Sequence, residues 1–277
     1  MLRTAAALAR DRHVLYTAAV QSPEPDLDFF ERIYRGEHGG SFRTLREDFC
    51  GTAALACEWV RRGPTHEAWG CDLDRPTLNW ARRHYLSRLG AAARRVHLLR
   101  RDVRAAGAPR ADVVAALNFS YSVFKTREVL RDYFRAVRGG LRPGGVFFLD
   151  VYGGTEAIVE ATDRRRIAAS RAPDGSRIPP FTYIWEQAFF NPIDHHTICH
   201  IHFELAGGKK LRRAFSYDWR LWTLPELQEL LGEAGFSRSA VYVDRWDEKA
   251  NDGDGIYRRR TRFENQDGWV AYVVGYR

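Results

Sequence analysis

The periodicity of hydrophobic and polar positions changes along the chain, and these changes divide the chain into parts. Residues 1–42 carry apolar positions at helical spacing, over 12–21 and in DLDFFERIY at 26–34, which predicts an N-terminal helical cap. Residues 43–154 and 220–277 alternate short apolar runs with amphipathic segments. Residues 155–219 are rich in alternating strand patterns, which predicts a β-rich insertion between the two halves of a core.

The core pattern predicts strands that alternate with helices, which is typical of parallel βαβ units in a doubly wound α/β fold. The runs DVVAAL and GVFFLDV are apolar throughout, as expected of strands covered by helices on both faces. The predicted strands are 44–49, 67–74, 95–103, 111–119, 142–154, 236–246 and 269–277, and the predicted helices are 53–62, 76–89, 127–141 and 224–235.

The insertion follows the fifth predicted strand, whose carboxyl end faces the ligand side of an open sheet. A β-rich unit there covers that face, extends the sheet edge, or pairs with a second subunit, which leaves a homodimer open. Its mixture of aromatic and polar residues favours a cover for a small-molecule pocket. Within it and beyond we expect a helix at 155–170, strands at 181–190, 196–205 and 211–222, and loops at 171–180 and 247–255.

Composition narrows the class of protein. The chain has 277 residues, 45% of them hydrophobic, which is ample for a core, and no apolar run is long enough to span a bilayer. The apolar patch within residues 1–13 is too short for a signal peptide. No two cysteines form a CxxC pair, so we expect reduced core thiols and a cytoplasmic protein; the cysteines are Cys50, Cys57, Cys71 and Cys199.

The net charge of +8 raises the question of nucleic-acid binding. The basic residues are mostly arginine and are spread from Arg3 to Arg277, with the tightest runs at 164–166 and 258–260. No alternation of basic and aromatic residues marks a strand-binding groove. We therefore expect solvated charged faces rather than a nucleic-acid site.

The stretch TLREDFCGTAALACEWV, residues 44–60, predicts a strand, a tight turn at Gly51 and a helix start, an arrangement that offers backbone N–H groups to an anion. The next predicted strands end at Asp72, Asp102 and Asn118. A carboxylate after the second strand, here Asp72, can accept hydrogen bonds from both hydroxyls of a ribose. The G-x-G-x-x-G of a nicotinamide dinucleotide site is absent, which disfavours an oxidoreductase.

Over residues 43–152 and 220–277 the sequence resembles the class I S-adenosylmethionine-dependent methyltransferases. The resemblance lies in the turn, where Glu47 takes the family's acidic place and Phe49, Gly51 and Ala53 take its three glycines. It extends to GCDLDRPTLNWAR, RRDVR, LRPGGVFFLD and WTLPELQELLGEAGF. It implies a mostly parallel seven-stranded sheet with an antiparallel last strand.

The resemblance also implies a cofactor, S-adenosylmethionine, with its ribose on Asp72, its adenine amine near Asp102 and its adenine ring near Val103. The full set of cofactor-binding residues that it implies is Glu47, Phe49, Cys50, Gly51, Thr52, Asp72, Leu73, Asp102, Val103 and Asn118. The expected reaction is in-line transfer of the methyl group to a nitrogen or oxygen of a small molecule, with acceptor and cofactor held collinear and dry.

Catalytic residues are less defined by the sequence. NFSY, from Asn118 to Tyr121, has the spacing of the Asn-Pro-Pro-Tyr motif of amino-methyltransferases without its prolines. A base is needed only for an acceptor that arrives protonated, and the insertion offers candidates: Glu186, Asp194, His195 and Tyr217. Metal ligation is not expected, because no matching cysteine or carboxylate spacing accompanies the histidines of the insertion: His195, His196, His200 and His202.

Two alternatives remain open at this point. One is methylation of RNA or protein, which would use the arginine runs. The other is a non-catalytic cofactor-binding protein of the same fold, since Phe49 and Ala53 stand where the family has glycine.

Overall fold

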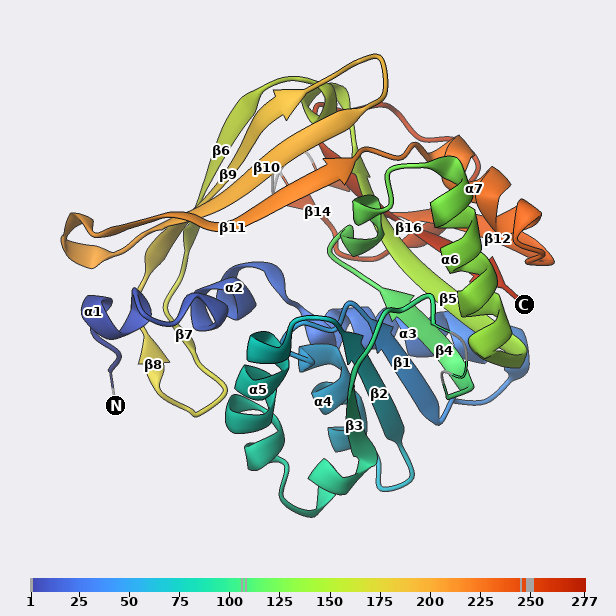
Figure 1. Ribbon diagram of the computed structural model, residues 1–277, viewed down its shortest axis with the longest axis horizontal. Coiled ribbons are helices and arrows are strands. Elements are labelled where there is room, and N and C mark those ends of the chain that lie inside the picture. The colour runs from blue at the N-terminus through green and yellow to red at the C-terminus, as the bar shows by residue number, and fades with distance from the viewer. Residues whose placement is uncertain (1, 106, 108, 245, 248–251) are drawn as a thin grey trace.

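An eight-stranded sheet forms the centre of the molecule (Figure 1), in the order β15-β12-β16-β5-β4-β1-β2-β3. The computed structural model describes residues 2–105, 107, 109–244, 246–247 and 252–277. Strands β3, β2, β1, β4 and β5 are parallel, and β16, β12 and β15 are added antiparallel. The strands are β1 Thr44–Asp48, β2 Glu67–Asp72, β3 Val96–Arg100, β4 Ala111–Ala116, β5 Leu141–Gly153, β12 Arg238–Val243, β15 Arg258–Arg260 and β16 Trp269–Tyr276.

Helices cover both faces of this sheet, as the uniformly apolar strands predicted. Along β5, Val146 and Phe148 point to one face, and Phe147 and Leu149 point to the other, because side chains alternate along a strand. The first face packs against α3, α4 and α5, and the second against α6 and α7. The helices of the core are α4 Ala54–Arg61, α5 Arg75–His84, α6 Arg127–Gly140 and α7 Leu224–Glu233, with 3-10 turns η1 Leu86–Arg88, η2 Gly90–Arg95 and η3 Ser120–Val123.

The N-terminal segment is helical, as predicted. It forms α1 Ala5–Leu8, α2 Arg12–Val20 and α3 Pro23–His38. Proline in the first turn of α3 fits the helix start, and Gly39 ends the helix in the left-handed conformation, with φ of 70°. Phe29 and Phe30 bury the inner face of α3 against the sheet, where Phe30 stacks on Phe148 at 4.1 Å.

A second sheet of four antiparallel strands lies above one end of the core (Figure 1), in the order β11-β10-β9-β6. Its three long strands match the prediction in position. These strands are β9 Phe181–Phe190, β10 His196–Glu204 and β11 Lys210–Arg220, with the 3-10 turn η5 Ala206–Gly208 between the last two. The fourth, β6 Ala161–Ile167, pairs with β9 along its whole length.

The prediction of a helix over 155–170 is wrong. Only a 3-10 turn, η4 Thr155–Ile158, precedes β6, whose residues are almost all exposed. A charged, exposed edge strand carries no apolar periodicity, and its backbone is satisfied by pairing with β9 instead of by a helix. The predicted loop at 171–180 contains a small hairpin, β7 Ser170–Arg171 with β8 Arg177–Ile178.

The C-terminal half also departs from prediction at two places. Strand β15 extends the core sheet beyond the seven expected strands by pairing with β12. The loop predicted over 247–255 falls partly outside the described residues, and β13 Trp246–Asp247 pairs with β14 Asp252–Gly253 across it.

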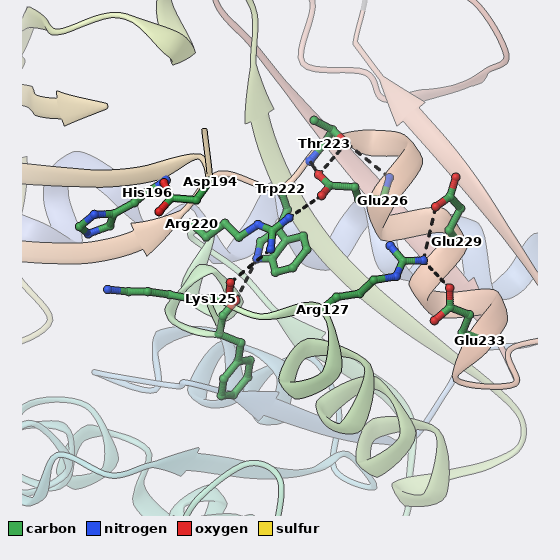
Figure 2. A network of polar contacts seen from close by, with 11 residues as sticks. Lys125, Arg127, Asp194, His196, Arg220, Trp222, Thr223, Glu226, Glu229 and Glu233 are labelled. Atoms are coloured by element: carbon green, nitrogen blue, oxygen red, sulfur yellow. Dashed lines mark hydrogen bonds and ion pairs between the residues drawn. The ribbon is translucent and has the colours of Figure 1, made fainter. Parts of the chain in front are cut away.

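The exit of the insertion is fixed to the core by the polar network of Figure 2. Arg220, at the end of β11, donates to the carboxylate of Glu226 at 2.8 Å and to the carbonyl of Lys125 at 3.2 Å. Its guanidinium also lies 3.8 Å from the ring centre of Trp222. Thr223 and Glu226 form a reciprocal capping box at the start of α7. These contacts hold the insertion's last strand at the start of a core helix.

Two expectations from composition can be compared with the structure. All four cysteines are buried free thiols, as predicted. Among the described residues, no helix is both long and apolar enough to cross a membrane.

Candidate active site

The turn after β1 has an unusual backbone. Phe49, Gly51 and Ala53 have φ angles of 56°, 49° and 57°, all in the left-handed region that favours glycine. For Phe49 and Ala53 this conformation costs on the order of 1 kcal/mol each. Packing holds Phe49 in place, because its ring lies 5.6 Å from that of Tyr133 and 5.8 Å from that of Phe124. The turn therefore keeps a glycine-like shape at two positions that have no glycine.

Asp72 lies beside this turn, at the end of β2, and backbone groups orient its carboxylate. The Gly51 N–H donates to Asp72 Oδ2 at 2.8 Å, and the Asp74 N–H donates to Asp72 Oδ1 at 2.8 Å. No ion pair among the described residues engages this carboxylate, so each oxygen keeps a lone pair for a further donor. Asp74 begins α5 by accepting from the Thr77 N–H at 3.0 Å.

The residues expected around an adenine differ in their exposure and in whether they are already paired. Leu73 follows Asp72 and is 63% exposed, whereas Val103 is buried. Asp102 is half-buried, and Arg104 binds its carboxylate through the backbone N–H at 2.8 Å and through Nη2 at 2.7 Å. The hydrogen bonds from the Arg104 side chain lower the pKa of Asp102. Asp102 is thus already paired with a cation, unlike Asp72.

Three further residues of the implied cofactor set lie beneath the turn. Glu47 is buried and accepts from the Ala56 N–H at 3.0 Å, at the start of α4. Cys50 is buried against Gly70, where a Cβ would come within 2.9 Å of its sulfur. Thr52 is buried and donates to Gln21 Oε1 at 2.7 Å. Through Gln21 the end of α2 is tied to the turn.

The turn after β4 is shaped by Asp150, a residue that the sequence did not single out. Asn118 and Phe119 have φ angles of 56° and 57°, and their N–H groups donate to the Asp150 carboxylate at 2.7 and 2.9 Å. Tyr121 is fully buried and donates to the Asp150 carbonyl at 2.8 Å. Asn118 and Phe119 line the large cavity described next, and Tyr121 does not. Tyr121 is therefore a structural residue of this turn, contrary to the expectation that it could act in catalysis.

A cavity of about 840 Å³ opens between the core, α2 and the second sheet. One side is aromatic: the rings of Tyr217 and Trp219 stack at 4.2 Å, and Trp185 lies 6.1 Å from each. Tyr16, on α2, approaches the Tyr217 hydroxyl, and burial raises the pKa of both phenols. Tyr16 of the N-terminal helices thus lies against the aromatic residues of the insertion.

The other predicted bases lie away from this cavity. Tyr183, Trp185 and Gln187 line it from β9, so Glu186 projects from the opposite face of the strand. There Glu186 pairs with His202 Nε2 at 2.8 Å. The placement of Glu186, Asp194 and His195 at the acceptor site was wrong; the last two lie in or beside the β9–β10 turn, outside the cavity lining.

Sequence reasoning missed several lining residues. Tyr152, at the end of β5, lines the cavity, and its buried hydroxyl lies beside the buried thiol of Cys199 without forming a close hydrogen bond among the described residues. Asp163 and Arg165 reach the cavity from β6, the strand predicted as helix. A period-2 reading of TDRRRI would have placed these two on one face, but its uniformly polar residues gave no apolar pattern to support it.

Carboxylates without basic partners surround the ends of the core strands. We call Asp26, Glu47 and Asp150 the enclosed carboxylates. Burial raises the pKa of Glu47 to about 8, that of Asp150 to about 7 and that of Asp26 to about 6. Repulsion adds to this, from Asp72 and Asp26 on Glu47 and from Asp26 on Asp150. The Tyr272 hydroxyl donates to Asp26.

None of the enclosed carboxylates forms an ion pair with a basic side chain of the described residues. A buried carboxyl group with a raised pKa is stabilised in its ionised form by a nearby positive charge, so these groups favour a positively charged ligand. The chemistry of these groups, with the oriented Asp72 and the exposed Leu73, fits S-adenosylmethionine, which carries a sulfonium and an ammonium beside a ribose and an apolar base. The histidines of the insertion form no comparable site, because no group of three metal-ligating residues occurs in the described ranges.

Comparison with known proteins establishes the fold. The chain matches an S-adenosylmethionine-dependent methyltransferase from Clostridium acetobutylicum with a TM-score of 0.64 and 17% identity, over 94% of this chain and 96% of that one. It matches an amino pentose methyltransferase from Micromonospora echinaspora, solved with S-adenosylmethionine, with a TM-score of 0.65 and 16% identity over 96% of both chains.

A third match is the sugar N-methyltransferase KedS8 from Streptoalloteichus, with a TM-score of 0.63 and 17% identity, over 96% of this chain and 92% of that one. No protein-family model and no curated protein sequence matches the chain. The protein thus has the fold of S-adenosylmethionine-dependent methyltransferases over nearly its whole length.

Proposed function

We propose that the protein is an S-adenosylmethionine-dependent methyltransferase that acts on a nitrogen or oxygen nucleophile of a small molecule. The observation that carries this proposal is the Asp72 carboxylate, which two backbone N–H groups orient beside a turn of glycine-like shape and which forms no ion pair with the basic side chains that the structure describes. In this reading Asp72 accepts the ribose hydroxyls, Leu73 and Val103 contact the base, and the enclosed carboxylates stabilise the cofactor's positive charge.

The bound cofactor would supply a methyl group with a neutral thioether as leaving group, so the protein needs no general acid. Its residues have to position the acceptor and exclude water. In the proposal, residues 1–42 close the site, residues 43–154 and 220–277 bind the cofactor, and residues 155–219 cover the acceptor. Tyr16, Trp185 and Tyr217 are placed to enclose an acceptor, and aromatic faces also stabilise an adjacent cation.

The structural neighbours include proteins described as amino pentose and sugar N-methyltransferases. This supports a small acceptor with an amine as the first class to screen, with hydroxyl acceptors second. The cavity volume of about 840 Å³ suits a small molecule and is at the upper range of ligand pockets. Methylation of RNA or protein would require the acceptor to enter this covered cavity, and it is the less supported alternative.

The proposal is tested first by mass spectrometry of the purified protein for co-purifying S-adenosylmethionine or its demethylated product. Calorimetric titration with both compounds then measures affinity directly. A labelled-methyl screen of amines, amino sugars, hydroxylated compounds and bulk tRNA identifies the acceptor class. Binding of the cofactor without transfer to any acceptor would favour the non-catalytic alternative, and absence of binding would refute the proposal.

A further inference from the structure

A second hollow, separate from the large cavity, lies between the start of α2, the later part of α5 and the start of β11, after the β10–β11 turn. It measures about 530 Å³ and shares no lining residue with the large cavity. Seven of its lining residues are basic side chains, and one is acidic. The hollow is lined by Ala9, Arg10, Asp11, Arg12, His13, Trp80, Arg83, His84, Leu211, Arg212, Arg213 and Ala214.

The single carboxylate in this hollow, Asp11, is already engaged. It accepts from the Trp80 indole N–H at 2.9 Å and from the Val14 N–H at 3.4 Å, and it pairs with Arg3 at 3.3 Å. Arg12 is also committed, because it donates to the Ala214 carbonyl at 2.9 Å. Asp11 therefore neutralises little of the positive charge that the hollow gathers.

Four other arginines of the hollow are exposed and form no ion pair with any carboxylate of the described ranges. They come from three separate parts of the chain: Arg10, Arg83, Arg212 and Arg213. Many other arginines on the surface are paired, as Arg62 is with Asp28 and Glu31. Folding thus creates a concentration of unpaired guanidinium groups that the linear sequence does not reveal.

The backbone of β11 is distorted at this point. Arg213 has a φ of 48°, and the pairing of β10 with β11 skips residues between Phe203↔Leu211 and Ile201↔Phe215. Adjacent residues of a regular strand point to opposite faces, so Arg212 and Arg213 could not both line one hollow. The irregularity brings both to it, and a strained non-glycine residue at such a place commonly marks a functional position.

We propose that this basic hollow binds a small ligand that carries a phosphate or diphosphate group. Planar guanidinium groups bind phosphate oxygens in pairs, and several of them converging on a concave site suit a compact polyanion better than a monoanion. Trp80 and His84, stacked at 4.4 Å, form one wall. A compact, open hollow of this kind differs from the extended basic stripe that tracks a nucleic-acid backbone.

The hollow adjoins the proposed acceptor cavity through shared elements. Phe215 contacts the ring of His13 at 5.8 Å on one side and that of Tyr16 at 4.9 Å on the other. Helix α2 contributes His13 to the hollow and Tyr16 to the large cavity. The phosphate-bearing ligand would therefore bind next to the helix that closes the cavity, at a site of its own.

The test is calorimetric titration of the full chain with inorganic pyrophosphate at constant ionic strength. The variant Arg83→Gln with Arg212→Gln removes two guanidinium groups that form no ion pair among the described residues, and we expect its affinity to fall at least about tenfold. The matched control, Arg82→Gln with Arg166→Gln, removes the same charge from outside the hollow and should bind as the natural chain does. Melting temperatures within a few degrees of each other confirm that both variants fold.

Three results would overturn the proposal. The first is that the natural chain does not bind pyrophosphate at millimolar concentration. The second is that both double variants weaken pyrophosphate binding equally, which would show that only net charge matters. The third is that bulk tRNA binds more tightly than pyrophosphate and with a steep salt dependence, which would make the surface a nucleic-acid site. Titration of the same samples with S-adenosylmethionine separates this outcome from the proposed enzymatic function, because cofactor affinity should be the same in all of them.

Discussion

Carboxylates of the second sheet and the enclosed carboxylates of the core differ in whether a basic side chain pairs with them. In the second sheet each prominent carboxylate has a basic partner: Glu204 pairs with Arg164, and Asp218 with Lys125. These hydrogen bonds lower the pKa of Glu204 to about 2 and lower that of Asp218.

Around the core sheet the enclosed carboxylates have raised pKa values and no basic partner among the described residues. Glu204 and Asp218 are thus already paired, one within its own sheet and the other with a core lysine. The enclosed carboxylates would instead gain from a positively charged ligand, as the proposed function requires.

The largest expected effect comes from removing the second sheet. Replacing residues 160–219 by a short Gly/Ser linker should reduce methyl transfer by more than about a hundredfold, because the acceptor loses its positioning and its shield from water. S-adenosylmethionine affinity, measured by calorimetry, should change by less than about threefold. A folded deletion variant that still methylates the native acceptor at the normal rate would place the acceptor site elsewhere.

A narrower version of this test uses two neighbours on β9. Trp185→Ala removes an aromatic wall of the cavity and should lower kcat/KM for the acceptor by roughly thirtyfold, in line with loss of one buried aromatic contact. Glu186→Ala, on the opposite face of the same strand, is the control and should leave kcat/KM nearly unchanged. Equal effects from the two would contradict the assigned faces.

Asp72 and Asp102 provide the sharpest contrast within the core. Asp72→Ala removes an oriented, unpaired carboxylate and should weaken S-adenosylmethionine binding roughly thirty- to hundredfold, equivalent to about 2–3 kcal/mol. Asp102→Ala should weaken S-adenosylmethionine binding less than about threefold, because Arg104 already pairs with that carboxylate. Calorimetry on both variants decides the point, and unchanged affinity for Asp72→Ala would remove it from the cofactor site.

The pH dependence of binding should follow the enclosed carboxylates. Their folded pKa values of about 6 to 8 lie above the usual unfolded values, so the folded chain holds more protons and the free energy of unfolding falls as pH rises through that window. Ionised carboxylates attract the cofactor's positive charge, so its affinity should rise roughly tenfold from pH 5.5 to 8.5. Melting curves with and without S-adenosylmethionine check both trends, and affinity that declines over this range would refute the electrostatic role.

The smallest expected effect concerns Tyr152. Its buried hydroxyl forms no close hydrogen bond among the described residues and lies beside the weakly polar thiol of Cys199, so Tyr152→Phe should change the free energy of unfolding by less than about 1 kcal/mol. If that hydroxyl contacts the acceptor, KM should rise a few-fold while cofactor affinity stays constant. A loss of stability instead would show that the hydroxyl has a structural partner.

The core could be read from the sequence because its strands are buried on both faces and its helices are strongly amphipathic. Gly51, Asp72 and Asp102 could be placed because strand ends follow directly from that alternation. Strands β6 and β15 were missed because their residues are mostly exposed, which leaves no hydrophobic periodicity to detect.

The part of the site that escaped prediction depends on contacts between distant segments. Asp150 shapes the turn after β4 across 31 or 32 residues, and Tyr272 reaches Asp26 across 246. No local pattern encodes such partners. The side of β9 from which Glu186 projects could not be predicted for a different reason. The two faces of a strand can be assigned only when the element that covers one of them is known.

The left-handed turn at Phe49, Gly51 and Ala53 has a consequence for how related sequences are recognised. A sequence motif that requires glycine at each of these positions depends on residue type, whereas a bound ligand would contact the main chain and so depends on its conformation. Here the main chain follows that path although Phe49 and Ala53 both carry side chains, and the rings of Phe124 and Tyr133 pack against Phe49. Comparing torsion angles instead of letters would bring together distant homologues that a glycine fingerprint leaves apart.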